Sequence, residues 1–212
     1  MTASGAISVA SKNCPLGLFG GRFDPVHRGH IAIAKAVADE LNLDEVRWIV
    51  TGDPVHKPAI ASANERLVMT KLALHDWGDI RMVADDREVI AAKNGGASFT
   101  AETVRSLQLD YPGRKLIWIL GEDQLQNFLS WSHWQWLIHQ VDLAVCARPN
   151  TISKGVSEVL IREGAEIRWI QVAPDEVSST SIRDRIRLGN KVGEMLPRSV
   201  CEYISASRLY TS

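Results

Sequence analysis

Short apolar runs alternate with longer amphipathic stretches along most of the chain, and the order of the two is the main structural signal. The apolar, β-branched runs predict strands at residues 16–19, 46–50, 80–83, 116–120, 143–147 and 167–170. The stretches between them predict helices at residues 30–41, 63–75, 101–109, 125–138, 153–162 and 180–188. Strands that alternate with helices indicate a parallel sheet with helices on both faces, so we expect a doubly wound α/β fold.

One helix start carries its own chemical signature. Ser62 and Glu65 have the spacing of a capping box, in which each side chain accepts a hydrogen bond from the backbone N–H of the other residue. We therefore expect a helix to begin at residue 63. Because no linker rich in Gly, Ser or Pro interrupts the 212 residues, we expect one domain at residues 15–212, preceded by a flexible N-terminal segment at residues 1–14.

Composition narrows the class of protein. The chain has 24 basic against 25 acidic residues, a balance that argues against a nucleic-acid binder and favours a small-molecule site. Cys14, Cys146 and Cys201 show no CxxC spacing, so we expect neither a zinc ribbon nor a disulfide framework, and a reducing, cytoplasmic setting instead. No run of 18 apolar residues occurs, so no membrane segment is expected.

The first predicted strand leads into the stretch GGRFDPVHRGH at residues 20–30. In an open α/β sheet, ligands bind beyond the carboxyl ends of the strands. Gly20 and Gly21 allow a tight turn and let a ligand approach the backbone, and Gly29 removes a side chain at the helix start. The following helix offers N–H groups to an anion, and His27 and His30 lie three residues apart on one of its faces. The stretch therefore predicts a phosphate site.

A metal site has to be weighed against the phosphate site. Asp24, His27 and His30 are the residue types of a set with two histidines and one carboxylate. However, Pro25 fixes a turn where a regular ligand-bearing helix would be needed, and no pattern such as HExxH supports the set. We therefore expect no metal ion held by protein side chains here.

A second anion site is indicated near the other end of the chain, at VSSTSIR, residues 177–183. Hydroxyl groups at a helix start cap the helix and expose donors to an anion, and Arg183 has the planar fork that grips two phosphate oxygens. Taken alone, the stretch also fits an ordinary helix cap with a solvated arginine. Together with the first stretch, it predicts a cleft that holds phosphates from two sides.

Both stretches carry a family resemblance. GGRFDPVHRGH resembles the GGxFDPxHxGH signature of the nucleotidyltransferase superfamily that transfers adenylyl or cytidylyl groups to small phosphate esters, and VSSTSIR is similar to its ISSTxIR signature. The Walker pattern GxxxxGKS/T does not occur in the sequence, which disfavours a P-loop kinase or ATPase. The resemblance implies a Rossmann-like nucleotidyltransferase fold. It assigns ATP binding to Gly20, Gly21, Phe23, Gly29, Ser178, Ser179 and Thr180.

Three internal stretches resemble the bacterial nicotinate-nucleotide adenylyltransferases in particular. DPVHKP at residues 53–58 resembles their PPHKP loop, and Arg66 and Met69 fall where that family has an arginine and a methionine. SFTAET at residues 98–103 resembles their SYTxxT stretch, and GEDQL with the aromatic residues and the Arg-Pro pair after it resembles their GxDxLxxFxxW…RP block. The resemblance implies that the enzyme forms deamido-NAD and pyrophosphate from ATP and nicotinate mononucleotide.

The same resemblance places six residues on the mononucleotide side of the site, namely Arg22, Asp24, Lys57, Thr100, Asp123 and Trp131. Trp131 is expected to offer a flat face to the pyridine ring, whereas Trp134 and Trp136 are expected in the core. Departures from the family pattern are Arg22 for a threonine or serine, Val55 for a proline and Glu122 for a small residue. Glu122 pointing inward would favour an amide over a carboxylate, so a nicotinamide-preferring or dual enzyme stays open.

The implied reaction is in-line attack of the mononucleotide phosphate on the α-phosphorus of ATP, with no covalent enzyme intermediate. We expect His27, His30 and Arg183 to be catalytic, with His30 at the α-phosphate, the other two at the departing phosphates, and Lys57 assisting. Mg²⁺ is the expected cofactor, held mainly by phosphate oxygens and water. A pantetheine-phosphate or cytidylyl-transferring relative and a nucleotide-sensing binding module are the alternatives, and the oligomeric state, including a homo-oligomer, stays open.

Overall fold

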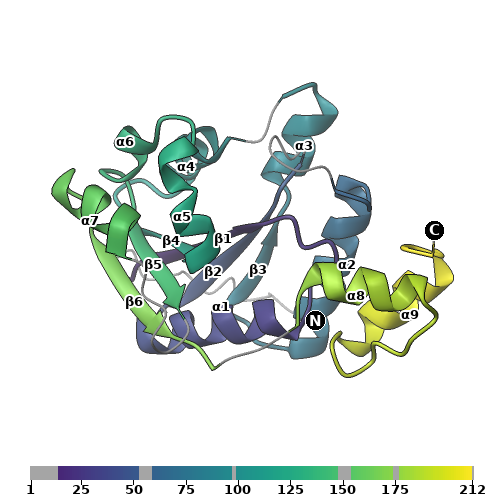
Figure 1. Ribbon diagram of the computed structural model, residues 1–212. Helices are drawn as coiled ribbons and strands as arrows, with labels where there is room; N and C mark the ends of the chain where they lie inside the picture. The colour runs from purple at the N-terminus through teal and green to yellow at the C-terminus, as the bar shows by residue number, and fades with distance from the viewer. Residues whose placement is uncertain (1–13, 53–58, 97–98, 148–153, 174–176, 212) are drawn as a thin grey trace, which may run out of the picture.

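The computed structural model describes residues 14–52, 59–96, 99–147, 154–173 and 177–211, which form one α/β domain (Figure 1). The strands are β1 Leu16–Gly21, β2 Glu45–Val50, β3 Met82–Asp85, β4 Leu116–Gly121, β5 Asp142–Ala147 and β6 Ile167–Gln171. The helices are α1 Arg28–Glu40, α2 Ala63–Trp77, α3 Arg87–Lys93, α4 Thr100–Asp110, α5 Glu122–Gln126, the 3-10 helix η1 Phe128–Ser130, α6 Trp134–Leu137, α7 Lys154–Arg162, α8 Ser179–Arg187 and α9 Arg198–Ala206.

The strands form one sheet in the order β3-β2-β1-β4-β5-β6, and every neighbouring pair is parallel. The chain starts at the centre with β1, builds outward to β3, and then returns to β4 on the other side of β1. This reversal is the switch point of a doubly wound fold, where ligands bind beyond the carboxyl ends of the strands. The expected fold class is confirmed.

The two faces of the sheet belong to two separate hydrophobic clusters. Leu18 and Phe19 are neighbours in β1 but lie in different clusters, because successive strand residues point to opposite faces. The cluster around Phe19 and Trp48 includes buried residues of α1, α2, α8 and α9, and the cluster around Leu18 and Trp118 includes those of α4, α5, α6 and α7. Helices thus cover both faces (Figure 1), and each large side chain buried in full contributes roughly 1.5–3 kcal/mol.

All the predicted strands are present, with one boundary corrected. Ile80, predicted to open the third strand, lies in the turn before β3 and is 96% exposed. Gly78 explains the shift, because it ends α2 in the left-handed conformation and the chain needs a further turn before it enters the sheet. The predicted capping box is confirmed, since Ser62 N–H donates to Glu65 at 2.7 Å and Glu65 N–H donates to the Ser62 hydroxyl at 3.3 Å.

The helix predictions were wrong in two respects. The single helix predicted at residues 125–138 is broken into α5, η1 and α6, and His133 before α6 has a left-handed φ of 57°. Helices α3 and α9 were not predicted at all. Both are short, with seven residues in α3 and nine in α9.

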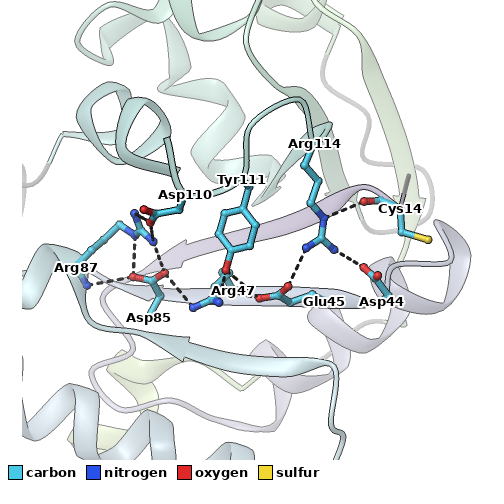
Figure 2. Close-up of polar contacts among 9 residues, drawn as sticks. All are labelled: Cys14, Asp44, Glu45, Arg47, Asp85, Arg87, Asp110, Tyr111 and Arg114. Carbon is cyan, nitrogen blue, oxygen red and sulfur yellow. Dashed lines mark hydrogen bonds and ion pairs between the residues drawn. The ribbon is translucent and has the colours of Figure 1, made fainter. Parts of the chain in front are cut away.

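A set of charged side chains, hereafter the ionic network, lies beside the amino ends of β1, β2 and β4 and reaches the end of β3 (Figure 2). Its members are Asp44, Glu45, Arg47, Asp85, Arg87, Asp110, Tyr111 and Arg114. Arg114, just before β4, donates to Asp44, to Glu45 at 2.8 Å and to the carbonyl of Cys14 at 2.9 Å. One guanidinium therefore ties together the chain segments that lead into three strands.

Candidate active site

The loop after β1 lies at the switch point of the sheet, but its two glycines serve a different purpose from the one expected. Gly20 and Gly21 are the last residues of β1 and do not adopt a positive φ. A Cβ on Gly20 would lie 2.6 Å from the ring of Trp118, and one on Gly21 would lie 2.8 Å from the ring of Phe23. The tight turn predicted at this pair was therefore wrong, since the glycines make room for aromatic rings.

Phe23 makes the sharp change of direction in this loop. Its φ of 50° is left-handed, which is uncommon for a bulky residue. The ring is buried and packs edge-on against His30, with 5.1 Å between centroids, and against Phe19 at 5.4 Å. In the structure its ring packs against His30, and the prediction that Phe23 binds ATP stays a prediction.

His27 and His30 stand together at the start of α1. His27 is the N-cap residue, and the two imidazole rings lie 3.7 Å apart between centroids at an angle of 33°. The backbone N–H of His27 donates to Nδ1 of His30 at 3.2 Å. Because Nδ1 is the acceptor, the proton of a neutral His30 sits on Nε2, which is then a hydrogen-bond donor.

The pKa of His30 lies well below the usual value for an imidazole. Burial is the larger cause, because it disfavours the charged form, and the neighbouring His27 lowers the pKa further. His30 is therefore neutral at pH 7 in the ligand-free protein. A neutral imidazole can still donate one hydrogen bond, and an arriving phosphate dianion would favour its protonation.

The two phosphate-binding stretches meet, as predicted. Ser178 caps α8 by accepting a hydrogen bond from the backbone of Ser181 at 3.1 Å. The hydroxyl of Ser179 donates to the Pro25 carbonyl at 3.0 Å, across 154 positions of sequence. Arg183 Nη1 donates to the Asp24 carbonyl at 2.7 Å. The start of α8 therefore lies against the loop that also carries the two histidines.

Arg183 is oriented mainly by neutral acceptors. Besides the Asp24 carbonyl, it donates to the Thr180 hydroxyl at 3.3 Å. The Asp24 carboxylate is 4.0 Å away, and the Arg183 side chain is 13% exposed. The guanidinium is thus fixed in direction by two neutral acceptors, and its ion pair with Asp24 is long, which suits a residue that is predicted to meet a phosphate.

Asp24 was predicted to face the mononucleotide, but the structure uses its carboxylate inside the protein. It accepts from the backbone N–H groups of Ile60 at 2.8 Å and Ala61 at 3.1 Å, and from the Tyr210 hydroxyl at 2.7 Å. Asp24 thereby joins the loop after β1, the start of α2 and the turn after α9. Tyr210 carries no motif, so the sequence analysis missed it.

Arg66 in α2 fixes two loops at once, a role that the sequence analysis did not assign. It is 1% exposed and donates only to carbonyl groups, those of Arg22, Thr51, Gly52 and Ala61, at 2.6–3.2 Å. Burial lowers its pKa, but an arginine keeps its proton at any working pH. The loops after β1 and β2 are therefore anchored to one buried cation.

Of the residues predicted on the mononucleotide side, Asp123 and Trp131 lie against β4. Asp123 in α5 folds over Gly121, since a Cβ there would lie 2.7 Å from its carboxylate oxygen, and Thr100 is the first residue of α4. Trp131 is half-buried, stacks on Phe128 with 4.7 Å between centroids, and stands edge-on to Trp118 at 6.2 Å. Lys57 lies outside the described residues.

The other two tryptophans of this segment are less buried than predicted. Trp134 and Trp136 pack against the edge of the core cluster and stay half-exposed. The guanidinium of Arg105 lies 4.3 Å from the centre of the Trp136 ring. The short helix α6 explains the difference, because its four residues cannot turn both rings inward.

Within the described ranges, no three side chains of His, Cys, Asp or Glu are placed to hold a metal ion together. In the same part of the chain, no helix has the length and apolar character needed to cross a membrane. The start of α8 and the guanidinium of Arg183 contact the loop that carries the two histidines. Such a set suits an anion such as a triphosphate.

Comparisons with known proteins agree with this geometry. Residues 18–185 match the family model described as cytidylyltransferase-like. A probable nicotinate-nucleotide adenylyltransferase of Bordetella petrii is 37% identical over 92% of this chain and 98% of its own length. A probable nicotinate-nucleotide adenylyltransferase of Neisseria meningitidis serogroup B is 35% identical over 92% of this chain and 98% of its own length. The fold resembles that of Plasmodium falciparum nicotinic acid mononucleotide adenylyltransferase complexed with NaAD, with a TM-score of 0.78. The two chains are 16% identical, and the match covers 93% of this chain and 98% of the other.

Proposed function

This chain belongs to the nicotinate-nucleotide adenylyltransferases of the cytidylyltransferase-like family, and on that premise we propose how its cleft joins ATP to nicotinate mononucleotide. The products are deamido-NAD and pyrophosphate. The observation that carries the proposal is the contact between the two phosphate-binding stretches, through Arg183 to the Asp24 carbonyl and Ser179 to the Pro25 carbonyl. It brings a cation and two helix starts to the stacked histidines, at the switch point of the sheet.

The protein's task in this reaction is to hold and orient, since the mononucleotide phosphate is itself the nucleophile. His30 donates from Nε2 to an oxygen of the α-phosphate, where negative charge shifts as the new bond forms. Its Nδ1 is tied to the backbone, so the ring needs no reorientation when ATP arrives. His27 stands beside it and meets the departing phosphates.

Arg183 neutralises the leaving pyrophosphate. Its bonds to a carbonyl and a hydroxyl set the plane of the guanidinium before ATP binds, which lowers the entropic cost of gripping the β- and γ-phosphates. The N–H groups at the starts of α1 and α8 add their partial positive charge to the same place. Ser178 and Thr180 stand at that second helix start.

The mononucleotide lies on the β4 side of the cleft in this proposal. Phe128 covers one face of Trp131, so the pyridine ring stacks on the other face, while Thr100 and Asp123 contact the ribose phosphate portion. Glu122 and Arg22, which depart from the family pattern, are the residues by which this chain would differ from its relatives in recognition of the pyridine substituent.

Magnesium fits this site only as part of the substrate complex. The cleft presents imidazole and guanidinium groups, which are poor ligands for Mg²⁺, and the Asp24 carboxylate is used within the protein. We propose that the ion is held by the triphosphate and water, and that it supplies neutralisation of phosphate charge. The three free cysteines, Cys14, Cys146 and Cys201, support a reducing, cytosolic setting.

The test measures pyrophosphate release from ATP and Mg²⁺ with nicotinate mononucleotide and, side by side, with nicotinamide mononucleotide. We expect the acid to be the better substrate by kcat/KM. The variant His30→Ala serves as the control for contaminating activity and should be nearly inactive while its circular dichroism spectrum is unchanged. No release with either mononucleotide would refute the proposed function, and faster release with the amide would shift the substrate to nicotinamide mononucleotide.

A further inference from the structure

Tyr210 contacts the cleft although it lies far from both phosphate-binding stretches in sequence. It stands in the turn after α9 and is 5% exposed, with its ring in the same hydrophobic cluster as Phe19 and Phe23. Its hydroxyl donates to Asp24 Oδ1 at 2.7 Å, across 186 positions of sequence. The backbone of Tyr210 has a left-handed φ of 63°, a conformation that is unfavourable for a bulky residue. The backbone is therefore strained at the residue that supplies this hydroxyl group.

Asp24 links that hydroxyl to Arg183. The side chain of Asp24 accepts from Tyr210, and the carbonyl of the same residue accepts from Arg183 Nη1 at 2.7 Å. The Asp24 carboxylate also forms a long ion pair with the guanidinium, with Oδ2 at 4.0 Å. The carbonyl and the carboxylate of Asp24 therefore compete for Arg183. The hydrogen bond to the carbonyl holds the guanidinium in an orientation in which it can still bind a ligand.

How strongly the Asp24 carboxylate attracts Arg183 depends on how many hydrogen bonds the carboxylate already accepts. Its donors are Tyr210 and the N–H groups of Ile60 and Ala61. A carboxylate with three donors attracts a further cation less strongly than one with two, because its charge is spread over more hydrogen bonds. Burial and the nearby Asp24 charge raise the pKa of Tyr210, so its hydroxyl keeps the proton that it donates.

We propose that Tyr210 is a positioning residue for Arg183, whose hydroxyl satisfies the Asp24 carboxylate and so keeps the guanidinium directed to the phosphates of ATP. Without that hydroxyl, Arg183 moves closer to Oδ2, and the present long ion pair of 4.0 Å becomes a direct one. The inference rests on the proposed function, in which Arg183 meets the departing phosphates. It adds a residue that touches no substrate and lies outside both sequence motifs.

The test compares Tyr210→Phe with Tyr203→Phe, which removes a hydroxyl from α9 at a half-buried tyrosine packed on the same cluster. Calorimetric titration with ATP alone should show about tenfold weaker binding for Y210F, which corresponds to about 1.4 kcal/mol. Y203F should bind as the wild type does. In steady-state assays, KM for ATP should rise in Y210F while KM for the mononucleotide stays within about twofold.

A double-mutant cycle separates positioning from a general loss of stability. In an Arg183→Lys background, Y210F should change kcat/KM for ATP by less than about twofold, because the group it positions is already gone. The inference is overturned if the effects of Y210F and Arg183→Lys on kcat/KM simply multiply in the double variant, or if Y210F and Y203F bind ATP equally well. If Y210F is not folded at the assay temperature, the titration is repeated at a lower one. A chain unfolded there too would assign Tyr210 to stability alone.

The two proposals fail in distinguishable ways. An inactive wild-type enzyme that binds ATP tenfold more tightly than Y210F would refute the reaction and leave the positioning role standing. An active wild-type enzyme with no difference between the two phenylalanine variants would refute only the positioning role.

Discussion

Arginines are held in two different ways at two places in this molecule. In the ionic network, Arg114 is buried between the carboxylates of Asp44 and Glu45 (Figure 2). In the cleft, Arg183 donates to a carbonyl and a hydroxyl, and its ion pair with the Asp24 carboxylate is 4.0 Å long. Arg66 also donates to carbonyls, but it is 1% exposed and anchors two loops, so its charge is closed to a ligand.

The difference separates structural cations from functional ones. A guanidinium between two carboxylates has its charge cancelled, so it holds chain segments together but cannot attract a further anion. A guanidinium oriented by backbone dipoles has a fixed direction and keeps its charge. The same residue type therefore stabilises the strand entrances in one place and prepares a phosphate site in the other. Three arginine substitutions test this division, and a fourth substitution, at His30, tests the electrostatics of the cleft.

The largest effect is expected for Arg183→Ala. It removes the cation that we propose meets the leaving pyrophosphate, so kcat/KM for ATP should fall about 10³-fold, or about 4 kcal/mol. The free energy of unfolding should change little, because no tight ion pair is broken. Steady-state kinetics and urea titration measure the two quantities. A variant with near-normal turnover would mean that the charge of Arg183 is not used in the reaction.

Arg114→Ala should give the opposite pattern. Loss of the guanidinium takes the partner from Asp44, leaves Glu45 with Arg47, and leaves the Cys14 carbonyl without its donor, which should destabilise the fold by roughly 1–3 kcal/mol. At a temperature where the variant is folded, kcat and both KM values should stay within about twofold of the wild type, a size typical of surface changes away from a site. Thermal unfolding followed by circular dichroism gives the stability, and activity lost without stability would contradict the division.

Much of the fold and the centre of the site could be predicted because their signals are local. Each strand is a short apolar run, and the stretch with His27 and His30 is a continuous motif whose spacing alone predicts a phosphate site. Its meeting with Arg183 was also predictable, since both stretches follow strands and so lie at the carboxyl edge of one sheet.

The features that the sequence did not predict depend on contacts between segments that lie far apart in the sequence. Tyr210 reaches Asp24 across 186 positions, and no periodicity or motif reports such a pair. Gly20 is a glycine because the ring of Trp118 in β4 occupies the space of its Cβ. The break near His133 was hidden for a related reason, because apolar residues at helical spacing continue through it while tertiary packing decides the backbone.

A smaller effect, on pH dependence, tests the electrostatics of the cleft. Burial and His27 lower the pKa of His30, so the unfolded chain takes up its proton first as the pH falls below about 6.5. The contribution of His30 to the free energy of unfolding is therefore complete above that pH. It is lost on acidification until the pH reaches the pKa of His30 in the folded chain. The loss is about 1.4 kcal/mol for each pH unit between the pKa values of the unfolded and folded chains. In His30→Asn, whose amide oxygen can replace Nδ1 as acceptor, stability should fall less between pH 8 and pH 5. Equal losses in urea titrations of both proteins would show that His30 is not held neutral.

The smallest effect is expected for Arg187→Ala, one turn after Arg183 on α8. Arg187 pairs with Asp184 at 2.5 Å, but the two side chains are 55% and 50% exposed, so the pair contributes at most about 0.5 kcal/mol. Both its stability and its kcat/KM for ATP should match the wild type. The variant is the matched control for Arg183→Ala, because each removes one positive charge from the same helix. If the two variants lost activity equally, the total charge of α8 would matter and the orientation of Arg183 by neutral acceptors would not.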